Sequence, residues 1–172
     1  MYASICPMSN YVFYALNIVF FALPLALFEI NLEKAKGWGG GFAKDKWYAK
    51  SSLKGTFIDR VITKITRYES PLNYHLIIMI SFQLVFILEY IYGSRNLFLI
   101  LACYFGVNFF ADFFWFLFNW HFDSFRQLLK GPHGSISWHK SWIKIGKESY
   151  LPSTYPLWLG ISIVFFILAG FW

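Results

Sequence analysis

The apolar segment from Leu97 to Asn119 contains a single charged residue, the acid Asp112. A segment of this length can cross a bilayer as a helix, where an unpaired acid costs roughly 2.5–3.5 kcal/mol on insertion scales. Steps of four, four, three and four place a set of side chains on one helix face: Tyr104, Asn108, Asp112, Trp115 and Asn119. The segment therefore predicts a polar line inside a membrane protein, with Asp112 as the first candidate for chemistry.

Histidines and glutamates from other segments could join Asp112 in a site. Imidazole and carboxylate groups together suit zinc or non-haem iron, and they also serve acid–base catalysis. The catalytic residues that we predict are Asp112, His75 and Glu29. The ligands that we predict for zinc or non-haem iron are Glu29, His75, Asp112, His139 and His121, with Glu33 next in line.

No short motif supports this metal site. The patterns HxxxH, HExxH and ExxH are absent, as are the clustered histidine boxes of membrane desaturases. The leading ligands Glu29, His75, Asp112 and His139 come from four different segments, so only the fold can bring them together. Three tryptophans are expected to wall a pocket open to lipid: Trp115, Trp138 and Trp142.

Each candidate also has a structural interpretation. Asp112 could be a buried hydrogen-bond partner of His75, Asn17 or Asn108. His75 could anchor a helix at the membrane interface, and His139 could belong to an aromatic belt. The other candidates could be surface groups, with Glu29 and Glu33 paired to Lys34 or Lys36 and His121 in solvent.

Composition indicates one membrane domain over residues 1–172. Hydrophobic residues make up 58% of the chain and charged residues 14%, against about a quarter charged in soluble domains. Four apolar stretches predict membrane-spanning helices: residues 11–30, 72–92, 97–119 and 155–172. Pro24 is expected to kink the first helix and to free a backbone carbonyl. The predicted fold class is all-α, an integral membrane protein with four transmembrane helices.

Two long connections, residues 31–71 and 121–154, separate the predicted spans. Within Lys44–Arg67, apolar residues recur at helical spacing and basic residues occupy another face. This pattern predicts an amphipathic helix that lies in the headgroup region. Before it, Gly37–Gly41 is expected to form a flexible break, with Trp38 as an interfacial anchor.

The distribution of basic residues predicts the orientation of the chain. Lys and Arg number nine in residues 31–71, one in the turn 93–96 and five in residues 121–154. By the positive-inside rule, both long connections are cytoplasmic and both termini lie outside, in a multi-pass protein of the cell membrane. This orientation gathers the predicted site at the cytoplasmic leaflet and leaves Glu89 at the other one. The net charge of +6 then indicates loops that face anionic lipid, and no nucleic acid is expected as a partner.

Cysteine content and the N-terminal sequence bound the chemistry further. Cys6 and Cys103 are the two cysteines, and no CxxC motif is present. A disulfide framework, a zinc ribbon and a thiol oxidoreductase are therefore unsupported, and Cys103 is expected to be a small buried hydrophobic residue. No Lys or Arg precedes the first apolar run, so we expect the first span to be retained rather than cleaved as a signal peptide.

Three classes of function fit these features. The first is a membrane-embedded, metal-dependent enzyme that acts on a lipid or another apolar substrate from the cytoplasmic side. The second is a non-catalytic subunit of a larger membrane complex or a homo-oligomer, with the aromatic surface of residues 97–119 as its contact. The third is a small transporter, which the lack of an inverted repeat argues against. Haem held by His75 and His121 is a further alternative.

Overall fold

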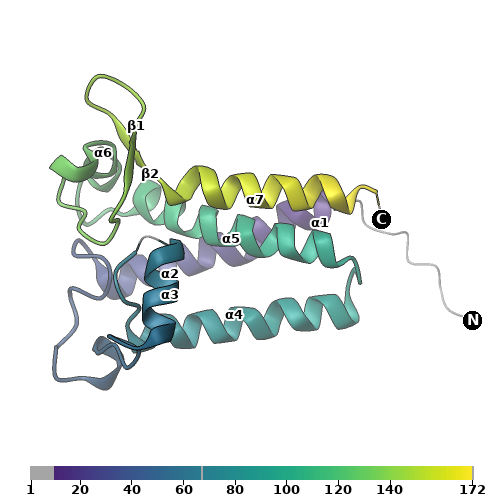
Figure 1. The fold of residues 1–172 in the computed structure, drawn as a ribbon, viewed down its shortest axis with the longest axis horizontal. Helices are drawn as coiled ribbons and strands as arrows, with labels where there is room; N and C mark the ends of the chain where they lie inside the picture. Colours follow the sequence, from purple (N-terminus) through teal and green to yellow (C-terminus); the bar gives the residue numbers. More distant parts are fainter. Residues whose placement is uncertain (1–9, 67, 172) are drawn as a thin grey trace, which may run out of the picture.

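Four helical stretches lie side by side in the computed structural model, which describes residues 10–66 and 68–171 (Figure 1). The first stretch consists of α1 (Asn10–Asn17), the π-helical turn η1 (Ile18–Ala22) and α2 (Leu23–Glu33). The other three are α4 (Asn73–Tyr92), α5 (Leu97–Phe118) and α7 (Thr154–Ala169). Helix accounts for 65% of the structure, so the prediction of a mainly helical fold is confirmed.

Three helices are long and apolar enough to cross a membrane: Asn10–Glu33, Asn73–Tyr92 and Leu97–Phe118. They coincide with the first three predicted spans. At the fourth predicted span, residues 155–172, the helix α7 has 16 residues, fewer than the roughly 20 that usually span a bilayer. Cys6 and Trp172 lie outside the described residues.

The first helical stretch widens into the π-helical turn Ile18–Ala22 just before Pro24. Proline lacks an N–H group, and its ring clashes with the carbonyl four residues earlier, which here belongs to Phe20. The regular hydrogen-bond ladder therefore cannot continue through this turn. The irregularity expected at Pro24 takes the form of a wider turn on its N-terminal side.

α5 packs along both α7 and the first helical stretch (Figure 1). Small residues at these contacts let the backbones approach closely, and Ala22, Ala26 and Ala102 are fully buried. The Ser162 hydroxyl on α7 donates a hydrogen bond to the Ala102 carbonyl at 2.7 Å and pairs with the Tyr14 hydroxyl at 2.8 Å. Neighbours on both sides thus fix α5 and the polar line that it carries.

Hydrogen bonds between distant segments define the two ends of the bundle. At one end, the side-chain amides of Asn10 and Asn96 both donate to the Ala169 carbonyl, at 3.3 and 3.0 Å. At the other end, the Asn119 amide donates to the Lys34 carbonyl at 2.8 Å. The start of α1, the turn between α4 and α5 and the end of α7 therefore lie together, and both long connections gather at the opposite end (Figure 1).

The first long connection contains η2 (Trp47–Ala49) and α3 (Phe57–Thr66). α3 is shorter than the helix predicted at Lys44–Arg67, because turns fill the chain up to Gly55, whose φ of +82° is left-handed. Arg67 lies outside the described residues. Large apolar side chains of α3 face outward, and Phe57 is 72% exposed.

The second long connection contains α6 (Ser124–Leu129), η3 (Gly131–His133), β1 (Trp142–Lys144) and β2 (Tyr150–Pro152). β1 and β2 form an antiparallel hairpin in which Ile143 lies opposite Leu151. An all-α prediction did not include this hairpin, because three-residue strands are too short to show an alternating pattern. The hairpin leads the chain into α7 and leaves the fold mainly helical.

Candidate functional site

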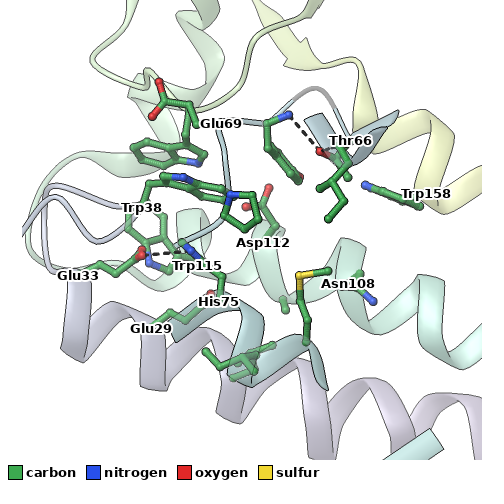
Figure 2. Close-up of a pocket in the computed structure, with 18 of the residues that line it drawn as sticks. Glu29, Glu33, Trp38, Thr66, Glu69, His75, Asn108, Asp112, Trp115 and Trp158 are labelled. Carbon is green, nitrogen blue, oxygen red and sulfur yellow. Dashed lines mark hydrogen bonds and ion pairs between the residues drawn. The ribbon is translucent and has the colours of Figure 1, made fainter. Parts of the chain in front are cut away.

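A cavity of about 200 Å³ lies at the end of the bundle where the long connections gather (Figure 2). Side chains of α2, α3, α4, α5 and α7 line it, together with residues of the two connections. Its ionisable lining residues are Glu29, Glu33, Glu69, His75 and Asp112, with two tyrosines, Tyr68 and Tyr104. The fold thus brings acids and an imidazole from separate helices to one enclosed space.

The Asp112–His139 pair joins α5 to the second long connection. Asp112 Oδ2 lies 3.5 Å from His139 Nε2, and the two side chains are 25% and 1% exposed. Asp112 lines the cavity and His139 lies behind it. Among the described residues, neither ring nitrogen of His139 nor Oδ2 of Asp112 forms a hydrogen bond. The facing atoms of the pair are therefore buried and retain hydrogen-bonding capacity, and a carboxyl group and an imidazole are both able to transfer protons.

Aromatic rings surround the His139 imidazole. Centroid distances to them range from 4.9 to 6.1 Å, for Tyr68, Trp142, Phe116, Tyr155 and Trp138. The backbone around His139 is held as well, because the Glu69 N–H donates to the Trp138 carbonyl at 3.1 Å. These contacts fix the imidazole against α5 and exclude water from its ring.

The Glu33–His75 pair joins α2 to α4, and hydrogen bonds from neighbouring groups hold both of its side chains. Glu33 Oε1 accepts from the Gly39 N–H at 2.8 Å and from the Tyr74 hydroxyl, and it lies 3.8 Å from His75 Nε2. His75 Nδ1 accepts from the Leu72 N–H at 3.1 Å. A neutral imidazole in this position carries its proton on Nε2, toward Glu33. The pair thereby fixes the start of α4 and the turn after α2.

Glu29 lies one helical turn before Glu33 and lines the same cavity. Within residues 10–66 and 68–171, its carboxylate forms no ion pair. Its carboxyl group lies within electrostatic range of two other acids, Glu33 and Asp112. The cavity therefore places three acids close together around Glu29.

Tyr68, in the segment between α3 and α4, lies beside the Asp112–His139 pair. Removal of its phenol from water, and then the nearby charge of Asp112, raise the pKa of Tyr68 well above its usual value. Tyr68 is therefore a neutral phenol at physiological pH, able to donate a hydrogen bond into the site.

The structure brings most of the predicted site residues together. Glu29, His75 and Asp112 line one cavity, and His139 contacts Asp112. His121 is exposed and does not line this cavity. In the part of the chain that the structure describes, no group of three His, Cys, Asp or Glu side chains is placed to hold a metal ion. The zinc or non-haem iron site therefore stays a prediction without geometric support.

The structural partners considered for Asp112 are engaged elsewhere. The Asn17 amide donates to the Phe13 carbonyl at 3.1 Å, and the Asn108 amide donates to the Tyr104 carbonyl at 2.7 Å. Glu89, which the predicted orientation places at the opposite leaflet, does not line the cavity. The ion-pair partner that the fold gives to Asp112 is His139, and the phenols of Tyr68 and Tyr155 lie beside the same carboxyl group.

Sequence reasoning ranked Glu33 second and missed Tyr74. The spacing of four between Glu29 and Glu33 places both on one helix face, which is a usable signal. No pattern linked Tyr74 to Glu33, because 41 residues separate them in the chain. The contact arises from the packing of α4 beside the end of α2.

The fold and the cavity define a class: a helical protein with candidate membrane-spanning helices and an acidic, aromatic-walled site at one end of the bundle. Comparison of the chain with protein-family models, with curated proteins and with solved structures finds no match. The functional inference therefore rests on the geometry of this site.

Proposed function

We propose that the protein is a multi-pass membrane enzyme that performs proton-transfer chemistry on a lipid or another apolar substrate. Asp112 is its proton-transfer group, Glu29 and His75 share its cavity, and His139 supports Asp112 from behind. The observation that carries this proposal is the Asp112–His139 pair, whose facing atoms are buried and lie 3.5 Å apart. Neither of these atoms has a hydrogen-bond partner among the described residues.

Four membrane-spanning helices are part of the proposal, with α7 as the fourth. α7 contains no charged residue and packs along α5. The two long connections carry 14 of the 15 Lys and Arg residues, so their end of the bundle would be cytoplasmic and both termini would lie outside. The exposed apolar side chains of α3, such as Phe57, would then enter the headgroup region of that leaflet.

The chemistry follows from which member of the pair faces the cavity. Asp112 lines the cavity and can accept a proton from a bound substrate or return one to it. His139, 1% exposed, contacts Asp112 rather than the substrate and is a positioning residue. A protonated imidazole would stabilise the Asp112 carboxylate, and a neutral one would let that carboxylate take up a proton.

Metal dependence is a separate part of the proposal. Zinc or non-haem iron would supply Lewis-acid chemistry, and Glu29, His75 and Asp112 line the cavity that would receive it. Elemental analysis of the purified protein tests this part. Stoichiometric zinc or iron that disappears in Asp112→Asn would support it, whereas a metal-free protein with turnover would remove it.

Lipid turnover tests the proposed enzyme directly. The purified protein is reconstituted into liposomes of total lipid extract, and the lipids are followed by mass spectrometry. We expect the wild type to convert one lipid class and Asp112→Asn to leave it unchanged. Glu148→Gln is the matched control, because it removes the same charge from an exposed residue remote from the cavity. Lipids that stay unchanged with the wild type would contradict the proposal.

A non-catalytic subunit of a larger membrane complex, or a homo-oligomer, is the alternative. The exposed surface of α4 favours this alternative, because Tyr74 and Phe86 are the two buried residues of this 20-residue helix. Many of its long apolar side chains are exposed: Ile77, Ile80, Leu84, Ile87, Leu88 and Ile91. Blue-native electrophoresis in mild detergent discriminates, since a band of monomer size would count against this alternative.

A further inference from the structure

Resting on the proposed function, we propose that the cavity binds an amphiphile through a positively charged amine or quaternary ammonium head group. The charge of the cavity lining, the unpaired carboxylate of Glu29 and the aromatic walls each point to such a ligand. The proposal names a substrate class for the site, and binding alone can test it.

The charge of the lining favours a cation. Glu29, Glu33, Glu69 and Asp112 line the cavity, and none of the described lining residues is Lys or Arg. Glu69 is paired with Lys140, which does not line the cavity, so the other three acids carry the argument. The one basic lining group is His75, whose Nδ1 accepts the Leu72 N–H and therefore carries no proton. A phosphate head group would meet several carboxylates and no cationic side chain among these residues, so an anionic ligand is disfavoured.

Glu29 and Trp115 are the polar groups that a ligand would satisfy. The Glu29 carboxyl group lacks an ion-pair partner in residues 10–66 and 68–171 and lies near two other acids, Glu33 and Asp112. A cation bound beside these acids would stabilise their ionised forms. Trp115 is 3% exposed, and its indole N–H has no acceptor in the described part of the chain. It points to a ligand that carries an acceptor oxygen near its amine.

Aromatic side chains form much of the remaining wall. The rings that line the cavity are Trp38, Tyr68, Tyr104, Trp115, Trp138 and Trp158, and Figure 2 shows Trp38 and Trp115 beside His75 and Asp112. Aromatic faces attract ammonium groups, and quaternary ammonium ligands are recognised in such cages. Acids and aromatic rings therefore act together on the same type of head group.

The cavity also has an apolar side that can contact the hydrocarbon tail of an amphiphile. Leu25, Ile78 and Met79 extend its lining along α2 and α4, beside Ala111 of α5. A volume of about 200 Å³ accommodates a small head group with the first carbons of a chain. A bare metal ion fits less well, because no three metal-ligating side chains converge within the described residues.

Titration with three twelve-carbon probes tests the inference in mild non-ionic detergent. The probes are dodecyltrimethylammonium, dodecyl phosphate and dodecanol, and intrinsic tryptophan fluorescence reports binding. We expect the ammonium probe to bind at least about tenfold more tightly than the phosphate probe. We expect Glu29→Gln to remove about tenfold of this preference, and the exposed control Glu148→Gln to retain it. A second variant, Trp158→Leu, should weaken binding of the ammonium probe about two- to fivefold and leave binding of dodecanol unchanged.

Three outcomes would overturn the inference. They are equal or tighter binding of the phosphate probe, an ammonium preference that survives in Glu29→Gln, and saturable binding of zinc alone that Glu29→Gln abolishes. Failure of the proposed enzyme is distinguishable, because binding is measured without turnover. Ammonium binding without lipid conversion would reject the enzyme alone, and lipid conversion without ammonium preference would reject this inference alone.

Discussion

The two carboxylate–imidazole pairs of this protein contain the same functional groups in different surroundings. Glu33 and His75 lie 3.8 Å apart, and Asp112 and His139 lie 3.5 Å apart. In the first pair, further hydrogen bonds engage Glu33 Oε1 and His75 Nδ1. In the second, Oδ2 of the acid and both imidazole nitrogens lack hydrogen bonds among the described residues.

This difference separates a structural role from a chemical one. A hydrogen-bonded buried network rigidifies the elements that it joins, and the atoms already engaged in it are less available to a ligand. An unsatisfied buried polar group costs about 1–3 kcal/mol of stability. Such a group is more readily kept where it serves chemistry. The Glu33–His75 pair therefore holds the cavity in shape, and the Asp112–His139 pair is the one expected to act.

Asp112→Asn should produce the largest effect. Loss of a general acid or base typically lowers the rate about 10²- to 10⁴-fold, and the amide cannot exchange a proton with the substrate. Because Oδ2 has no hydrogen-bond partner to lose among the described residues, the apparent Tm should stay within a few degrees of the wild type. Lipid turnover in liposomes and thermal unfolding in detergent give the two measurements.

His139→Gln tests the same pair from the imidazole side. His139 contacts the proton-transfer group Asp112, so as a positioning residue it should affect proton transfer, and this variant should change the pH–rate profile of turnover. A variant that is merely less stable, with an unchanged pH profile, would assign His139 a packing role.

Gly37→Ala should disturb both pairs at once. Gly37 lies in the turn after α2 at a φ of +52°, and a Cβ atom here would collide with the indole ring of Trp138. The left-handed backbone and the overpacking together should cost about 2–4 kcal/mol. Gly146→Ala is the matched control, since a Cβ at Gly146 meets ordinary contact distances in the hairpin turn. Equal apparent Tm values for the two variants would contradict the expected contact with Trp138.

Two buried tyrosines, Tyr74 and Tyr155, compare the Glu33–His75 pair with the Asp112–His139 pair. The Tyr74 hydroxyl donates to Glu33, whereas the Tyr155 hydroxyl lies beside Asp112 without a hydrogen bond of normal geometry among the described residues. Tyr74→Phe should cost about 1.5–3 kcal/mol, as expected for a hydrogen bond to a charged group. Tyr155→Phe should change stability by less than about 0.5 kcal/mol. Thermal unfolding of both variants checks this, and a larger loss in Tyr155→Phe would reverse the comparison.

The sequence predicts two of the four acids of the cavity, Asp112 and Glu29, better than it predicts the contacts between site residues. Asp112 and Glu29 are recognisable because a charge within or beside a long apolar run is costly and therefore informative. His139 was selected from its leaflet, but its contact with Asp112 depends on the path of a connection that no periodicity encodes. His121 was also selected because it is expected at this leaflet, but position along the membrane normal does not specify where a side chain points. His121 is exposed and does not line the cavity.

The fold likewise divides into helices that the sequence predicts and connections that it does not. The three long apolar helices are predictable because their length and hydrophobicity are matched to a bilayer. The β1–β2 hairpin was not predictable, because contacts with distant residues stabilise it more than local pattern does. The shape of the site therefore depends mostly on the two connections, where sequence periodicity is weakest.

Tyr68→Phe should give the smallest effect, visible at alkaline pH. Burial and the charge of Asp112 raise the pKa of the Tyr68 phenol in the folded protein above its value in the unfolded chain. Stability from this phenol is complete below about pH 10, the unfolded pKa, and is lost as the pH rises toward the folded pKa. The fall in apparent Tm between about pH 9 and about pH 11 should therefore be smaller in Tyr68→Phe than in the wild type. The exposed control Tyr92→Phe should match the wild type, and an equal fall in all three proteins would place Tyr68 in water rather than beside Asp112.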